Sequence, residues 1–112
     1  MKNINQIRAR NAFNSAPNIE RGQNGGEVVK DIPPIIMNNG LLPALAHAHA
    51  HEKNGWKSVF KAAEKHLQDD DIKLLPKGAD LLDYLITKAD SQSLKLITNE
   101  ILAWLEFLRR FA

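Results

Sequence analysis

The sequence lacks several features that would place it in a membrane, secreted or metal-binding class. It has no cysteine, which excludes a disulfide framework and a thiolate metal site. It has no uncharged apolar run of about 18 residues, so we expect no membrane-spanning helix. Its first ten residues, MKNINQIRAR, have no apolar stretch of the kind found in secretory signals. We therefore interpret the protein as cytoplasmic.

The chain also carries little net charge. The chain has 15 Lys and Arg residues against 13 Asp and Glu residues, a net charge of +2, which is weak evidence for a nucleic-acid partner. Residues 1–40 hold five basic and three acidic residues, whereas residues 41–112 hold ten of each. Any contact with a polyanion must therefore come from local clusters of basic residues.

The bulk composition is that of one globular domain. A length of 112 residues, with 44% hydrophobic and 25% charged residues, suits a single core spanning residues 1–112. Residues 18–26 collect Asn, Gly, Gln and charge with one apolar residue, which predicts a flexible loop.

The last segment, Leu94–Ala112, carries the strongest pattern. Twelve of its nineteen residues are apolar, and seven of them recur at steps of three and four, which places them on one helical face. These are Leu94, Ile97, Ile101, Trp104, Leu105, Leu108 and Phe111. We expect a long core helix, capped by Asp90 or Ser91.

The rest of the chain predicts shorter helices and no convincing strand. The segments are 2–15, 27–37, 41–52, 56–68 and 79–88. In the first, Ile4, Ile7 and Phe13 are expected to face inward. In the second, Pro33 and Pro34 must kink the helix or divide it, and the next residues, 38–40, look like a helix stop. The fold class is all-α, a compact bundle of about five to six helices.

Lysines mark the clearest candidate binding surface. Lys57, Lys61 and Lys65 follow one another at four-residue steps, so they drift by about 40° per step and project from one flank of a helix. Such cations can contact successive phosphates without reading bases. A solvated polar face is the simpler interpretation, and from the residues alone it is favoured.

Arginines supply the other RNA-binding candidates. Arg8 and Arg10 should be more exposed than their apolar neighbours, but at about 100° per residue they lie about 160° apart and cannot both serve one surface. Arg21 falls in the predicted loop, where it could order on binding. Arg109 and Arg110 lie at the end of the last helix. The helix dipole favours cations there, and this effect alone explains why the two arginines are present. The alternative is that this pair of arginines contacts another subunit or RNA.

The histidine run predicts no firm metal site. His47 and His51 would share a helical face and could ligate one metal, but a third ligand and a general base are missing nearby. With His49 they are better explained as a solvent-facing helix end. The acidic run at 69–71 is best explained as a solvated connection, because three consecutive carboxylates cannot all face one ion. We expect no metal, no cofactor and no catalytic residues.

Two segments together carry a family resemblance. Residues 32–41, IPPIIMNNGL, and residues 98–112, TNEILAWLEFLRRFA, resemble the small helical subunit of the type III-B CRISPR RNA-silencing complex, the Cmr small-subunit family. Residues 6–9, QIRA, with Ala12, are similar to that family's opening helix. The match spans nearly the whole chain. Pro34 and the extra histidines depart from the family pattern.

The resemblance implies a helical bundle that stacks as a few copies beside the backbone subunits of an antiviral effector complex. Backbone subunits hold most of the guide RNA, the small subunits line the groove for target RNA, and cleavage belongs to a backbone subunit. We therefore expect a non-catalytic, RNA-contacting subunit whose partners are the other subunits, copies of itself, guide RNA and target RNA. The alternative is a free-standing helical DNA-binding regulator with residues 56–68 as its recognition helix. That segment has few Asn, Gln and Arg residues for reading bases, which counts against it.

Overall fold

The computed structural model describes residues 3–19, 27–50 and 55–112, which form six α-helices and one short 3-10 helix. They are α1 (Ile4–Ser15), η1 (Ala16–Asn18), α2 (Glu27–Asn39), α3 (Leu41–Ala50), α4 (Trp56–Leu67), α5 (Leu81–Thr87) and α6 (Ser91–Phe111). Within those ranges there is no strand, which confirms the all-α prediction. Residues 20–26, most of the predicted loop, lie outside the described residues.

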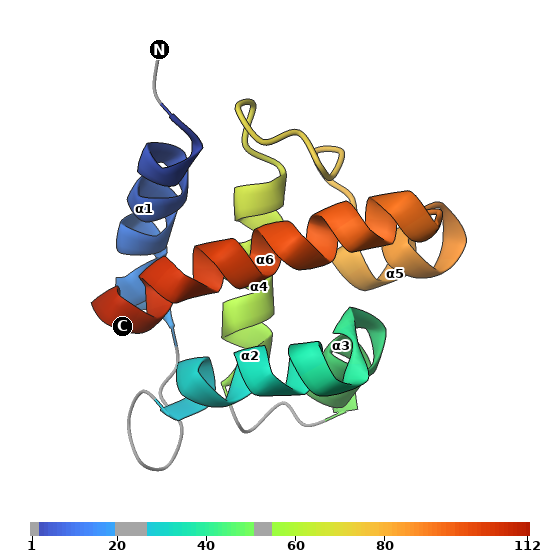
Figure 1. Cartoon of the computed structure of the whole chain (residues 1–112), viewed down its shortest axis with the longest axis horizontal. Coiled ribbons are helices and arrows are strands. Elements are labelled where there is room, and N and C mark those ends of the chain that lie inside the picture. Colours follow the sequence, from blue (N-terminus) through green and yellow to red (C-terminus); the bar gives the residue numbers. More distant parts are fainter. Residues whose placement is uncertain (1–2, 20–26, 51–54) are drawn as a thin grey trace.

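The long helix α6 crosses α4 and organises the other helices around it (Figure 1). Its C-terminal part packs beside α1, and it also contacts α2. Helix α4 touches α1, α2, α3 and α6, so it is surrounded on several sides. Among the described residues, no helix combines the length and the apolar character needed to cross a membrane.

The core contains the face predicted for α6. Its most deeply buried apolar side chains, Ile97, Ile101, Trp104, Leu105 and Leu108, follow the expected steps of three and four. The ends of the predicted face differ: Leu94 is half-buried, and Phe111 is exposed. The pattern is therefore correct from Ile97 to Leu108 and fails toward the two ends of the predicted face.

Helix α2 continues through both prolines, so of the two predicted alternatives the structure excludes two separate helices. Neither proline has an amide hydrogen, which deprives two carbonyls one turn earlier of their usual partners. Burial offsets this loss, because Val29, Ile32 and Ile36 line one face and are almost fully buried. The predicted stop is confirmed: Gly40 has φ of +92° and its amide donates to the carbonyl of Ile36 at 2.8 Å.

Side-chain caps fix several helix starts. The Asn3 side chain accepts the amide of Gln6, while the Gln6 side chain accepts the amide of Asn3, both at 2.9 Å, which is a capping box. Of the two residues predicted to cap α6, Asp90 is the cap, since its carboxylate accepts the amide of Ser93 at 2.8 Å.

The inward face predicted for α1 is wrong in part. Ile7 is buried as expected, but Ile4 and Phe13 are exposed, and Ala12 is buried instead. The reason is polar: Arg8 turns toward α6, where it pairs with Glu100. This pairing selects which side of the helix faces the core.

Candidate nucleic-acid interface

The three lysines predicted as a binding surface all lie exposed on α4. We call Lys57, Lys61 and Lys65 the lysine row. The opposite face of the helix is committed to the core through Trp56, Val59, Phe60, Ala63 and Leu67. Because burial fixes the rotation of α4, the lysines must point outward. Four residues of helix rise about 6 Å, so the row extends for about 12 Å.

The lysine row runs between two hollows. The larger, of about 500 Å³, lies between α3, α4 and α5 and includes Lys57 and Lys61 in its lining. The smaller, of about 210 Å³, includes Lys61 and Lys65 together with Ser15 and Asn18, from the end of α1 and from η1. A strand following the lysine row would therefore have recessed surface on both sides of it.

The acidic side chains beside the larger hollow are directed to the start of α5. Glu64 accepts the amide of Leu81 at 3.0 Å, and Asp80 accepts the amide of Asp83 at 3.0 Å. Carboxylates at a helix N-terminus are stabilised by unpaired amides and the helix dipole. Their presence is thus explained by the cap of α5.

Arg8 is engaged inside the protein. Its guanidinium donates to both carboxylate oxygens of Glu100, at 2.7 and 2.8 Å, and to the Asn5 side chain at 3.0 Å. This two-pronged pairing is the strongest geometry for an arginine and a carboxylate. The expectation that Arg8 is an exposed cation is wrong, because Glu100 lies on the inner side of α6 and draws it in.

Arg10 joins the same polar region through Asn11 and Asp69. Its guanidinium donates to Asp69 at 2.6 Å and to the Asn11 side-chain oxygen at 3.2 Å. The Asn11 amide nitrogen then faces Asp69 at 3.0 Å and His66 Nδ1 at 2.9 Å. His66 Nδ1 must therefore accept, which leaves Nε2 to donate to Glu100 at 2.9 Å.

This buried network holds its carboxylates charged. Burial alone raises the pKa of Glu100, but hydrogen bonds from Arg8 and His66 and the charge of Arg8 outweigh it and lower the pKa from 4.5 to about 2. Burial also raises the pKa of Asp69, and here too the hydrogen bonds it accepts lower it overall. The side chains of His66 and Glu100 are only 1% and 7% exposed, so these two groups lie in the interior.

Sequence reasoning missed the network and gave Glu100 no role. One signal could have found it: Glu100 lies three residues after Ile97 and four before Trp104, so it shares the buried face of α6. A charge in that position requires a partner.

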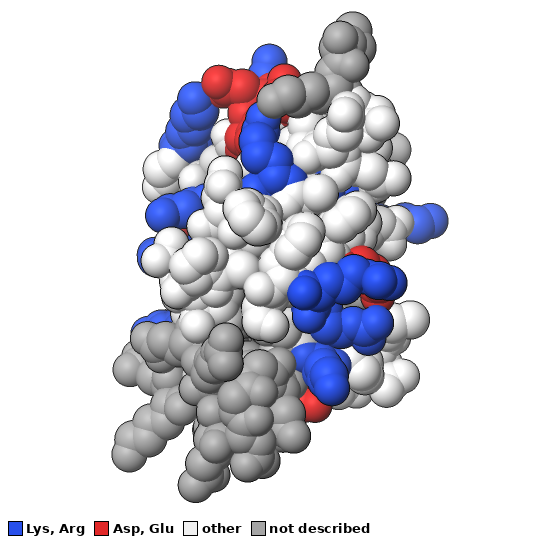
Figure 2. Space-filling model, turned by 90° about the vertical axis from the view of Figure 1, so that its left-hand side faces the viewer, with Lys and Arg blue, Asp and Glu red and all other residues white. Residues whose placement is uncertain are grey.

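The remaining arginine candidates are at the end of α6. Arg109 and Arg110 are exposed in the last turn, and Arg109 lies 4.0 Å from Glu106. Figure 2 shows Lys and Arg side chains in separate groups around a largely uncharged area, not in one continuous basic patch. Arg21 lies outside the described residues.

Comparison with known proteins identifies the family. A family model described as CRISPR-associated protein (Cas_Cmr5) matches residues 4–112. The chain belongs to this family. No match was found among curated proteins or among solved structures. The resemblance carried by residues 32–41 and 98–112 is confirmed, and the protein is a CRISPR-associated subunit of the Cmr type.

In this Cmr-family subunit the structure describes two residues of the histidine run, His47 and His49. His47 packs its ring 4.7 Å from that of Trp56, His49 lines the larger hollow, and His51 lies outside the described residues. Over the described ranges there is no group of three His, Asp or Glu side chains that could hold a metal ion.

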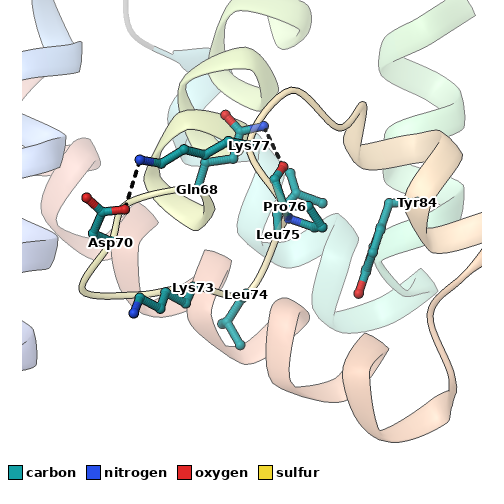
Figure 3. A pocket seen from close by; sticks show the side chains of 8 residues that line it. All are labelled: Gln68, Asp70, Lys73, Leu74, Leu75, Pro76, Lys77 and Tyr84. Atoms are coloured by element: carbon teal, nitrogen blue, oxygen red, sulfur yellow. Dashed lines mark hydrogen bonds and ion pairs between the residues drawn. The ribbon is translucent and has the colours of Figure 1, made fainter.

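The connection between α4 and α5 forms a third hollow, of about 300 Å³ (Figure 3). Asp70 and Lys77 pair across it at 2.9 Å, both largely exposed, and the Gln68 side chain donates to the Pro76 carbonyl at 3.2 Å. The prediction of a solvated acidic connection is correct for Asp70. It is wrong for Asp69, which is drawn into the network with Arg10.

Proposed function

We propose that this Cas_Cmr5 subunit is a non-catalytic component that packs against copies of itself and backbone subunits and contacts target RNA through the lysine row. The complex would act in antiviral defence in the cytoplasm. The observation that carries the RNA contact is the lysine row itself, exposed on a rigid helix between two hollows.

Such a contact would be independent of sequence. Lysine ammonium groups attract phosphates and release counterions, whereas base edges are left for the guide strand to read. Arg8 and Arg10 do not enter the proposal because Glu100 and Asp69 already hold them. A non-catalytic role is supported by the burial of His66 and Glu100, whose side chains would otherwise resemble an acid–base pair.

Assembly is tested by co-purification with the other Cmr subunits, one of them tagged, and guide RNA. The wild-type chain should elute with the guide-loaded complex, since family membership implies a place in it. Recovery of the complex without this chain, under conditions where all proteins are folded, would contradict the assembly proposal.

RNA contact is tested by changing the three lysines of the row to glutamine, which removes charge and keeps good helix formers. At about 0.7 counterions per phosphate, loss of three contacts should reduce the slope of log affinity against log salt by about 2. The measurement is a salt titration of single-stranded RNA binding.

A matched control removes the same charge from other exposed positions, Lys73, Lys88 and Lys95. The control variant should keep the wild-type slope, because only net charge has changed. Equal slopes for the two triple variants would show that the lysine row is no binding surface.

A further inference from the structure

Two phenylalanine rings meet on the surface at the end of α6. Phe13 is 63% exposed and Phe111 43% exposed, and their ring centroids are 5.4 Å apart at an angle of 86°. The fold does bury other aromatic rings, such as Phe60 and Trp104. The pair is therefore an aromatic surface, formed by residues 98 positions apart in the chain, that the core leaves uncovered.

An edge-to-face pair leaves ring faces available. One ring presents its edge to the other, so the contact occupies one of the four faces and the rest lack cover from the partner ring. Flat, exposed aromatic faces are the surfaces on which the unpaired bases of single-stranded nucleic acid stack. Base-paired strands offer no such faces, since their bases are already stacked.

Exposed cations in the last turn of α6, the turn that carries Phe111, indicate the charge of the occupant. Arg110 directly precedes Phe111 on α6, is exposed, and has no ion pair in the described part of the chain. Arg109, one residue further back, lies 4.0 Å from Glu106. An exposed ring pair with an exposed arginine in the same helical turn complements a ligand with flat apolar faces and a negative backbone. A purely apolar partner would leave that guanidinium to be desolvated without a counterion.

We propose that Phe13 and Phe111 form a stacking platform for bases of single-stranded nucleic acid, with Arg110 contacting an adjacent phosphate. This deepens the proposed function and rests on it, because target RNA is a single strand before it pairs with the guide. Phe13 lies two residues before Ser15 on α1, and Ser15 lines the smaller hollow together with Lys61 and Lys65.

The test compares a base-bearing strand with a base-free one. The probes are fluorescently labelled oligouridine and an abasic oligomer of equal length, titrated with the full chain by anisotropy. Wild-type protein should prefer oligouridine by about 5-fold to 150-fold per stacked base. The double variant Phe13→Leu with Phe111→Leu, which keeps apolar bulk but removes the flat rings, should lose that preference and keep its salt slope.

The conservative variant Phe13→Tyr with Phe111→Tyr should retain the preference, since its rings still stack. Single-stranded DNA serves as a second base-bearing probe. The same loss of binding to DNA in the leucine variant supports stacking, because both polymers carry flat bases. An unchanged preference for oligouridine in the leucine variant would overturn the platform. Circular dichroism of each variant checks folding, which these exposed positions should leave intact.

A second copy of the chain is the rival occupant. Sedimentation of the wild type and the leucine variant, with and without oligouridine, distinguishes a second copy of the chain from nucleic acid as the occupant of the ring pair. Self-association that persists in the leucine variant and resists oligouridine would overturn the proposal, because leucines can still form an apolar contact. If only the lysine variant loses RNA binding, the platform is wrong while the proposed RNA contact stands. If the wild type binds neither probe, both are wrong.

Discussion

Replacing Trp104 with alanine should lower the free energy of unfolding by about 3–5 kcal/mol, the cost of removing a large side chain from a packed core. Trp104 is fully buried in the middle of α6, and its ring stacks on that of His66 with centroids 5.7 Å apart and 17° between planes. Domains of this size have a free energy of unfolding of only about 5–15 kcal/mol, so the loss would be a large fraction of the total. Urea unfolding followed by far-ultraviolet circular dichroism measures it.

The control is Leu96→Ala on the same helix. Leu96 is exposed, so this variant should cost well under half as much as Trp104→Ala. Trp104→Phe should also cost less, because it leaves a smaller cavity and removes an indole Nε1 that has no hydrogen-bond partner in the described structure. Equal losses for Trp104→Ala and Leu96→Ala would contradict the central position of α6.

The burial of α6 could be predicted because it depends on local spacing alone. Residues three and four apart share a helix face whatever the rest of the chain does, so Ile97, Ile101 and Leu108 were identified correctly. The same reasoning failed at Phe111, whose ring stays 43% exposed although it contacts Phe13 of α1. Burial at the ends of a helix depends on which other segments cover it, and the spacing of the helix's own apolar residues does not specify those segments.

The lysine row was predictable for the same reason. Its exposure follows from the apolar face of α4, which lies within the same twelve residues. By contrast, Arg8 and Glu100 are 92 positions apart, and Arg10 and Asp69 are 59 apart. No local period specifies such pairs, so the sequence placed Arg8 and Arg10 among the exposed RNA-binding candidates. The Phe13 and Phe111 contact escaped notice for the same reason.

Replacing Glu100 with glutamine should lower the free energy of unfolding by about 3 kcal/mol. The substitution keeps the size of the side chain and an oxygen that can accept from His66 Nε2, but it leaves the half-buried Arg8 guanidinium without its counterion. Breaking a buried pair from one side typically costs about 3–5 kcal/mol, and the partial exposure of Arg8 places this case at the low end. Thermal or urea unfolding measures the loss.

A double variant separates the lost pair from a general loss of packing. Arg8→Met together with Glu100→Gln removes both charges while His66 keeps its acceptor, so it should be more stable than Glu100→Gln alone. Lys77→Met serves as the exposed control: its pair with Asp70 has side chains 72% and 76% exposed, so little change is expected. If the double variant is less stable than Glu100→Gln, an uncompensated Arg8 charge is not the cause of the loss.

The stability of the protein in acid should depend on the same Glu100 carboxylate. Because folding lowers the pKa of Glu100 from 4.5 to about 2, its ionised form stabilises the native state above about pH 4.5. That contribution is lost as the pH falls from 4.5 toward 2 and the carboxylate takes up a proton. Wild-type stability should therefore fall more steeply across this window than that of Glu100→Gln, which has no proton to gain there. Asp69 still titrates in both proteins, so the difference between the two curves isolates the charge that holds α1 against α6.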